Sequence, residues 1–206
     1  MISTDHVISK SLLAGVCISI GGYLFLSCHS AVIGTILFSV GLLSCVITDS
    51  PLFTSKGGFI TDAQDARRLV LVLLLNVFAA FMFGLVSKIL NPSLVDAANN
   101  ILTARMSTGY LPYIIKSIIT GFLITLAIES ENKPNSNHLI LILCVTGFIL
   151  SGCPHCIADS FYYGASSVIY KNPSLILHLL LVIIFNFIGC NLYNLFVNKS
   201  FIHIIK

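Results

Sequence analysis

The stretch that decides the fold runs from Thr48 to Ser55 and reads TDSPLFTS. A second interruption, from Gly152 to Asp159, reads GCPHCIAD and occupies the matching place in the second half of the chain. Each follows a long apolar run and contains a proline, which removes a backbone donor and disfavours helix in the residue before it. Broken hydrophobic segments at corresponding positions of two halves are typical of a substrate pathway through a membrane.

The composition predicts a polytopic membrane protein. The 206 residues are 56% hydrophobic and only 9% charged, with no Trp and a mean hydropathy of +0.97. A soluble domain of this length needs more polar surface, whereas lipid-facing helices are apolar all round. The net charge of +3 is too small to indicate a nucleic-acid partner, and seven cysteines, an odd number, indicate no disulfide framework.

Six apolar runs approach the length that spans a bilayer, about 20 residues each. We therefore expect one all-α transmembrane domain over residues 1–206, with one repeat over about 9–90 and a second over about 111–197. The second and fifth spans carry the interruptions. The runs are Ser9 to Cys28, Ala31 to Thr48, Leu69 to Leu90, Leu111 to Ile128, His138 to Gly152, and Ser174 to Val197.

The basic residues predict the orientation in a cell membrane, either an inner or a plasma membrane. The first run lacks the cleavage pattern of a signal peptide, so we expect it to stay in the protein. With six spans, seven basic residues share a side with both termini and four lie opposite, which predicts cytoplasmic ends. The four are Lys88, Arg105, Lys116 and Lys171.

Three spans per half is an odd number, so the halves should insert with opposite orientation, as inverted repeats do. Irregular backbone at membrane depth is tolerated only when it is buried in protein or lines a wet cavity, so both breaks should face inward. Counted from Ser9 and Leu111, Thr54 and His155 lie at nearly the same place in the two halves. We expect these two side chains to meet near mid-membrane.

His155 invites a chemical interpretation, because ionisable residues inside membranes are rare and His titrates near neutral pH. It could pass a proton to a weak-acid anion, or it could stabilise the charged anion together with the positive ends of the half-helices. A simpler interpretation makes His155 a helix-terminus residue bonded to a carbonyl. Thr54 could likewise be only the N-cap of a half-helix.

Both interrupted stretches resemble the formate/nitrite transporter family. Phe38 to Leu42, continuing through Leu52 to Ser55, is similar to the broken second helix of that family, and Ser151 to Phe161 resembles its Gly-x-x-His-x-Ile-Ala-Asn-x-Phe stretch. Ala14 to Ile20 also resembles its first helix.

The resemblance implies a homopentamer with one pore through each protomer. It places Phe38 and Phe148 at one hydrophobic constriction, and Leu42, Leu52 and Phe53 at the other. Thr54 and His155 would lie between the two constrictions. It implies small monovalent anions as substrates, formate first and then nitrite, hydrosulfide, acetate or lactate, with protons and the lipid bilayer as further partners.

Four residues depart from the family pattern. Pro154 replaces an acidic residue before the His and Gly121 replaces an Asn of the fourth helix, and these two suggest a roomier or less polar pocket. Asp159 replaces an Asn. Arg105 falls near a usual Lys. It is either a vestibule residue that concentrates anions or a solvated loop charge.

Three other functions are weighed against the anion pathway. Asn91-Pro92 and Asn172-Pro173 resemble the Asn-Pro-Ala boxes of aquaporins, which keeps an aquaporin-like channel for water or small neutral solutes as the alternative. No metal or cofactor is expected, because Cys153, His155 and Cys156 lie too close in sequence to surround one ion. No enzyme is expected either. The candidate nucleophile and base, Cys156 and His155, are adjacent in sequence, and adjacent residues on a helix point apart.

Overall fold

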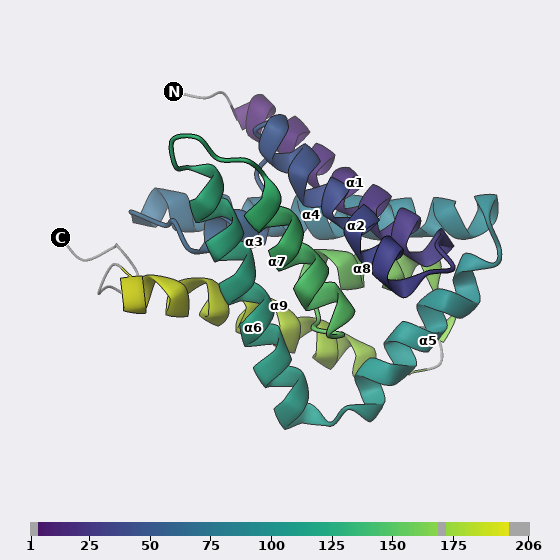
Figure 1. Ribbon diagram of the computed structural model, residues 1–206. Helices are drawn as coiled ribbons and strands as arrows, with labels where there is room; N and C mark the ends of the chain where they lie inside the picture. The colour runs from purple at the N-terminus through teal and green to yellow at the C-terminus, as the bar shows by residue number, and fades with distance from the viewer. Residues whose placement is uncertain (1–3, 169–171, 198–206) are drawn as a thin grey trace.

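The computed structural model describes residues 4–168 and 172–197, and this part of the chain holds nine helices and no strand. The prediction of an all-helical chain is confirmed. Figure 1 shows the helices crossing one another in a compact bundle. They are α1 (Thr4–Ser27), α2 (Ala31–Ile47), α3 (Phe53–Gly57), α4 (Ala63–Leu90), α5 (Leu94–Ser107), α6 (Tyr110–Glu131), α7 (Leu139–Leu150), α8 (Cys156–Ala165) and α9 (Ser174–Val197).

Four of the described helices, α1, α4, α6 and α9, are long and apolar enough to cross a membrane. The helices α2 and α7 are shorter, with 17 and 12 residues, and each is followed by a short irregular segment and a second helix, α3 or α8. Large apolar side chains cover the outside, for example Val70, Leu74 and Phe78 on α4, which are 57 to 61% exposed. Such a surface suits lipid rather than water.

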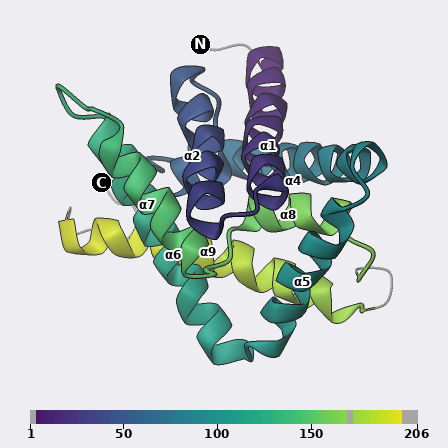
Figure 2. The ribbon, with the colours of Figure 1, turned by 45° about the vertical axis from the view of Figure 1, so that its right-hand side comes forward.

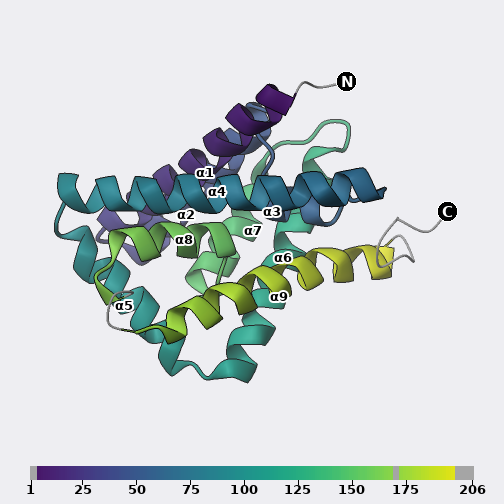
Figure 3. The same cartoon turned by 180° about the vertical axis from the view of Figure 1, so that it is seen from behind.

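The helices pack in the same way in the two halves of the chain. The helix α1 packs on α2 and α4, and α6 packs on α7 and α9. Each short second helix packs on the last long helix of the other half, α8 on α4 and α3 on α9. Figure 2 shows the α1–α2 and α6–α7 pairs side by side, and Figure 3 shows α8 lying between α4 and α9.

The contact between α4 and α8 is close because two glycines face it. A Cβ on Gly84 would lie 2.3 Å from the Phe161 carbonyl oxygen, and one on Gly164 would lie 2.1 Å from the Phe81 carbonyl oxygen. Any larger residue would separate the two helices. The close packing holds α8, and with it the residue that precedes α8, deep inside the protein.

Two features of the helices differ from the sequence expectation. The connection between α4 and α6 contains a further helix, α5, whose mixed polar and apolar sequence did not resemble a span. The helix α4 begins at Ala63 rather than at Leu69, because the Asp62 side chain accepts a hydrogen bond from the Asp65 amide at 2.7 Å and caps the helix. The polar stretch after Asp62 is therefore the first part of α4.

Candidate functional site

The two irregular segments have the same backbone conformation. Asp49 and Gly152, which come two residues after α2 and α7, adopt left-handed φ values of 50° and 65°. The next amide in each segment bonds back to the helix, Ser50 to Cys45 at 2.8 Å and Cys153 to Phe148 at 2.9 Å. Asp and Gly are among the residues that tolerate this conformation, so each helix is ended by local sequence.

A buried asparagine holds the start of α3 in place. The Asn76 side chain on α4 accepts a hydrogen bond from the Phe53 amide at 2.8 Å. Its Nδ2 donates to the Ser11 carbonyl at 2.7 Å and to the Pro51 carbonyl at 3.2 Å. Because buried backbone groups need partners, this one side chain pairs two backbone groups at the break, the Phe53 amide and the Pro51 carbonyl, and ties them to α1.

Asn186 on α9 does the same for the second break. Its Oδ1 accepts from the Cys156 amide at 3.0 Å, and its Nδ2 donates to the carbonyls of Ser117 and Pro154 at 2.8 and 3.1 Å. Sequence reasoning missed both asparagines, which are fully buried. The signal was a lone amide inside an apolar run, a residue type that membranes tolerate only with partners.

The breaks bring His155 and Thr54 together. His155 Nε2 lies 2.9 Å from Thr54 Oγ1, and the two residues are 1% and 0% exposed. On its other side, His155 Nδ1 accepts a hydrogen bond from the Ala158 amide at 3.3 Å, so that His155 caps α8. The neutral ring with its proton on Nε2 fits both contacts, and this proton is then donated to the Thr54 hydroxyl.

The simpler interpretation of His155 is confirmed in one part, because His155 is the residue that caps α8, but its ring contacts an amide and a hydroxyl rather than a carbonyl. Thr54 is not an N-cap, because α3 begins at Phe53 with Leu52 in the cap position. The residue that occupies the place of His155 in the first half is therefore Leu52, and Thr54 is the second residue of α3.

Aromatic rings lie on one side of His155. The centroid of the Phe148 ring is 6.0 Å from that of His155 and 6.5 Å from that of Phe38, and both phenylalanines are buried. Phe25 extends this row, 6.4 Å from Phe38. The structure thus brings together the two residues expected at the first constriction.

The residues expected at the second constriction are buried around α3. Leu42 lines a cavity of about 90 Å³ together with Ser55, Lys56 and Glu131. Leu52 and Phe53 are 0% and 5% exposed. The ring of Phe53 stacks on Phe187 of α9, with a centroid distance of 6.3 Å.

Arg105 and Asp159 form a buried ion pair at 3.0 Å. Arg105 is 8% exposed and Asp159 is 0% exposed, so the interpretation of Arg105 as a solvated loop charge is wrong. Arg105 Nη1 also donates to the Gly152 carbonyl at 2.9 Å. A residue of α5 thereby ties together the two sides of the break that contains His155.

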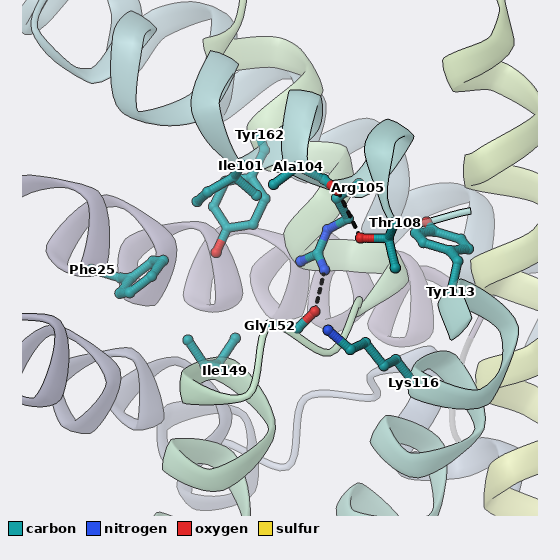
Figure 4. Close-up of a pocket in the computed structure, with 10 residues that line it drawn as sticks. All are labelled: Phe25, Ile101, Ala104, Arg105, Thr108, Tyr113, Lys116, Ile149, Gly152 and Tyr162. Carbon is teal, nitrogen blue, oxygen red and sulfur yellow. Dashed lines mark hydrogen bonds between the residues drawn. The ribbon is translucent and has the colours of Figure 1, made fainter. Parts of the chain in front are cut away.

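Arg105 lines a second cavity, of about 220 Å³, at the end of α6 opposite to Glu131. Figure 4 shows its walls, with the Arg105 guanidinium, the Lys116 amine and the Tyr162 hydroxyl around one space. Asp159 is not part of the wall. The lining residues are Phe25, Ile101, Ala104, Arg105, Thr108, Tyr113, Lys116, Ile149, Gly152 and Tyr162.

Other features considered in the sequence lie away from this centre or form no site. Asn91 ends α4, and the Asn172 carbonyl accepts from the Leu175 amide at the start of α9. Within the described residues, no group of three or more His, Cys, Asp or Glu side chains is placed to hold a metal ion. Gly121 does not enlarge a pocket, because a Cβ there would lie 2.0 Å from the Asn186 carbonyl oxygen.

A family model described as formate/nitrite transporter matches residues 1–193. No curated protein sequence matches the chain. Among solved structures, a chain described as a pentameric formate channel with formate bound has a TM-score of 0.74 and 20% identity, covering 94% of this chain and 92% of its own. A chain described as an FNT family ion channel has a TM-score of 0.79 and 19% identity, and the match covers 93% of this chain and 88% of the channel chain.

Proposed function

The chain belongs to the formate/nitrite transporter family, and from this premise we propose that it conducts small monovalent anions of weak acids across a cell membrane. Formate is the first substrate, followed by nitrite, hydrosulfide, acetate and lactate. The observation that carries the proposal is the buried His155–Thr54 pair, which lies beside the Phe38–Phe148 rings and at the start of α8. A polar pair between apolar walls suits a small anion that sheds most of its water.

The hydrogen bonds of His155 favour charge stabilisation over proton donation. To act as an acid, a neutral ring would first take up a proton on Nδ1. That nitrogen already accepts the Ala158 amide, and a protonated Nδ1 would face this N–H donor to donor. We therefore propose that the Nε2–H of His155 donates its hydrogen bond either to Thr54 or to the passing anion. The positive N-terminal end of α8 adds to the stabilisation of the anion. Any proton that crosses with the anion comes from water.

A proteoliposome flux assay tests both parts of the proposal. Formate, nitrite, hydrosulfide and lactate are compared at two pH values, in wild type and in His155→Asn, with glycerol as the neutral solute. We expect anion flux that rises as the pH of the supplying side falls, and we expect this acid stimulation to persist in His155→Asn. Loss of the stimulation would make His155 the proton donor. Glycerol flux without anion flux would identify the neutral-solute channel instead.

The further proposals are a homopentamer with a pore in each protomer, and two inverted repeats with both termini in the cytoplasm. The repeats are supported by the equal backbone conformation of the breaks and by the paired asparagines. The pentamer is supported by the similar fold of a pentameric formate channel. Reporter fusions at each end of the chain test the orientation.

A further inference from the structure

The cavity of about 90 Å³ beside Leu42 has a carboxylate in its wall, that of Glu131, the last residue of α6. The Glu131 side chain is only 5% exposed, and its Oε2 lies 2.6 Å from Nδ1 of His138. His138, just before α7, is 45% exposed and lines a separate cavity of about 310 Å³ at the connection between α6 and α7. The two bonded side chains therefore join an inner cavity to an outer one.

The hydrogen bond between these side chains determines how a proton can move through them. An ionised carboxylate only accepts hydrogen bonds, so a neutral His138 ring donates from Nδ1 and keeps on Nε2 the lone pair that can accept a proton. An exposed imidazole binds and releases protons at neutral pH. The second carboxylate oxygen, Glu131 Oε1, is buried and has no hydrogen-bond partner among the described residues. Glu131 therefore offers an open proton-binding position beside the inner cavity.

Other titratable groups face the pair but do not connect the two cavities. On the inner wall, Asp49 follows α2 and Lys56 belongs to α3. On the outer wall are Glu129 of α6, Lys133 and Tyr193 of α9. In the described part of the chain, the bonded side-chain pair with one member in each wall is the pair of Glu131 and His138.

The first half of the chain lacks an equivalent of this pair. The connection between α1 and α2 corresponds to that between α6 and α7, and it contains His29 but no Asp or Glu. Figures 1 and 2 show the α6–α7 connection at the same end of the bundle as the start of α1, the end proposed to face the cytoplasm. A proton route built on the pair would serve this end of the pathway alone.

We propose that Glu131 and His138 relay protons between the surface at the α6–α7 connection and an anion in the cavity beside Leu42. The relay deepens the proposed function and rests on it. A cavity of about 90 Å³ holds only about three waters of about 30 Å³ each, and hydronium is scarce at neutral pH. A fixed group that is reloaded from the surface therefore supplies protons faster than the enclosed water does.

Each step of the relay is a proton transfer along the observed contacts. His138 Nε2 takes a proton from water while the Nδ1 proton moves to the Glu131 carboxylate. The carboxyl O–H bond then breaks as an O–H bond forms on the anion, which leaves as the neutral acid. The neutral, exposed His138 ring rotates, so that a protonated nitrogen again faces Glu131. For an acid that arrives from the other end, the same steps run in reverse.

The test measures uptake of labelled formate into right-side-out and inside-out membrane vesicles of a bacterial host, with the same pH on both sides. The reporter fusions show which vesicle type presents the α6–α7 end to the formate. For supply from this end at neutral pH, we expect Glu131→Gln to lower the initial rate about tenfold, less than the roughly hundredfold loss typical of a positioned general acid, because water still supplies some protons. Supply from the opposite end should be unchanged.

His138→Asn is the second variant, because Asn suits the left-handed φ of 58° at this exposed position but does not titrate. It should lower the same initial rate as Glu131→Gln. The matched control is Glu129→Gln, which removes one negative charge from the wall of the outer cavity and leaves the pair intact. This control should resemble wild type when the rates are scaled to the amount of protein in the vesicles.

The loss in Glu131→Gln should shrink as the pH of both sides falls, because hydronium then reaches the cavity more often. A wild-type rate in both Glu131→Gln and His138→Asn would overturn the relay. An equal loss from both ends, or an equal loss in Glu129→Gln, would also overturn it. Absence of anion flux from either end in wild type would instead refute the proposed function itself.

Discussion

The pair of His155 and Thr54 shows how much one residue's hydrogen bonds restrict its chemistry. His155 caps α8 with Nδ1, which leaves Nε2 for Thr54 and, in the proposed function, for an anion. The backbone thereby selects the tautomer, as in other sites where one ring nitrogen is fixed by its partner. Arg105 and Asp159 act similarly, because each holds the other in a fixed position at the same break.

Thr54→Val tests the hydrogen bond at the residue scale. Val has nearly the same shape as Thr but leaves the buried Nε2–H unpaired, which costs about 1–3 kcal/mol. We expect formate flux to fall about tenfold, the factor that corresponds to about 1.4 kcal/mol. Thr54→Ser keeps the hydroxyl and should retain most of the flux. Equal flux in the two variants, measured in the same liposomes, would show that the hydroxyl has no role.

At the scale of the element, the short helices α3 and α8 depend on their neighbours. Their first amides bond to Asn76 and Asn186 on long helices, and α8 packs on α4 through facing glycines. Helices of 5 and 10 residues are marginal alone. The position of His155 is therefore set by α4, α5 and α9, whose contacting residues lie 30 or more positions away along the chain.

Gly121→Ala tests this dependence. A Cβ at Gly121 would lie 2.0 Å from the Asn186 carbonyl oxygen, so α6 and α9 must separate and Asn186 must move. Overpacking of this kind costs about 1–3 kcal/mol or more. We expect a lower melting temperature in detergent, together with reduced formate flux.

Gly147→Ala in α7 is the matched control, because nothing lies within 4 Å of the added Cβ. Ala is favoured over Gly in a helix interior by about 1 kcal/mol, so this variant should melt at an equal or higher temperature. If both variants shifted the melting temperature equally, the contact between α6 and α9 would not be the cause.

At the scale of the whole molecule, the proposed pathway has two unlike ends. One cavity is lined by one basic and two acidic residues, Lys56, Asp49 and Glu131, and the other by Lys116 together with Arg105, which is paired with Asp159. The backbone of the two halves is similar, but the charges are not. The pathway should therefore capture anions more readily from the side of α5.

The proposed assembly gives a prediction at this scale. The outer surface carries large exposed apolar side chains on several helices, and a pentameric channel has a similar fold. We expect native mass spectrometry of the detergent-purified protein to give a complex of five copies of the 22.3 kDa chain. A monomer that retains full anion flux in liposomes would contradict the pentamer as the functional unit.

The sequence by itself determined where the chain is apolar and where its helices end. Pro51, Pro154, Asp49 and Gly152 act on the backbone within a few residues, and such local effects can be deduced from sequence order alone. The importance of His155 followed from its residue type at membrane depth.

Only the tertiary structure decided which side chains meet. It aligned Leu52 rather than Thr54 with His155, paired Arg105 with Asp159 and made Gly121 a packing residue. It also revealed α5 and the two asparagines. These contacts join residues far apart in the chain. They depend on how whole helices approach one another, and no rule confined to neighbouring residues specifies that approach.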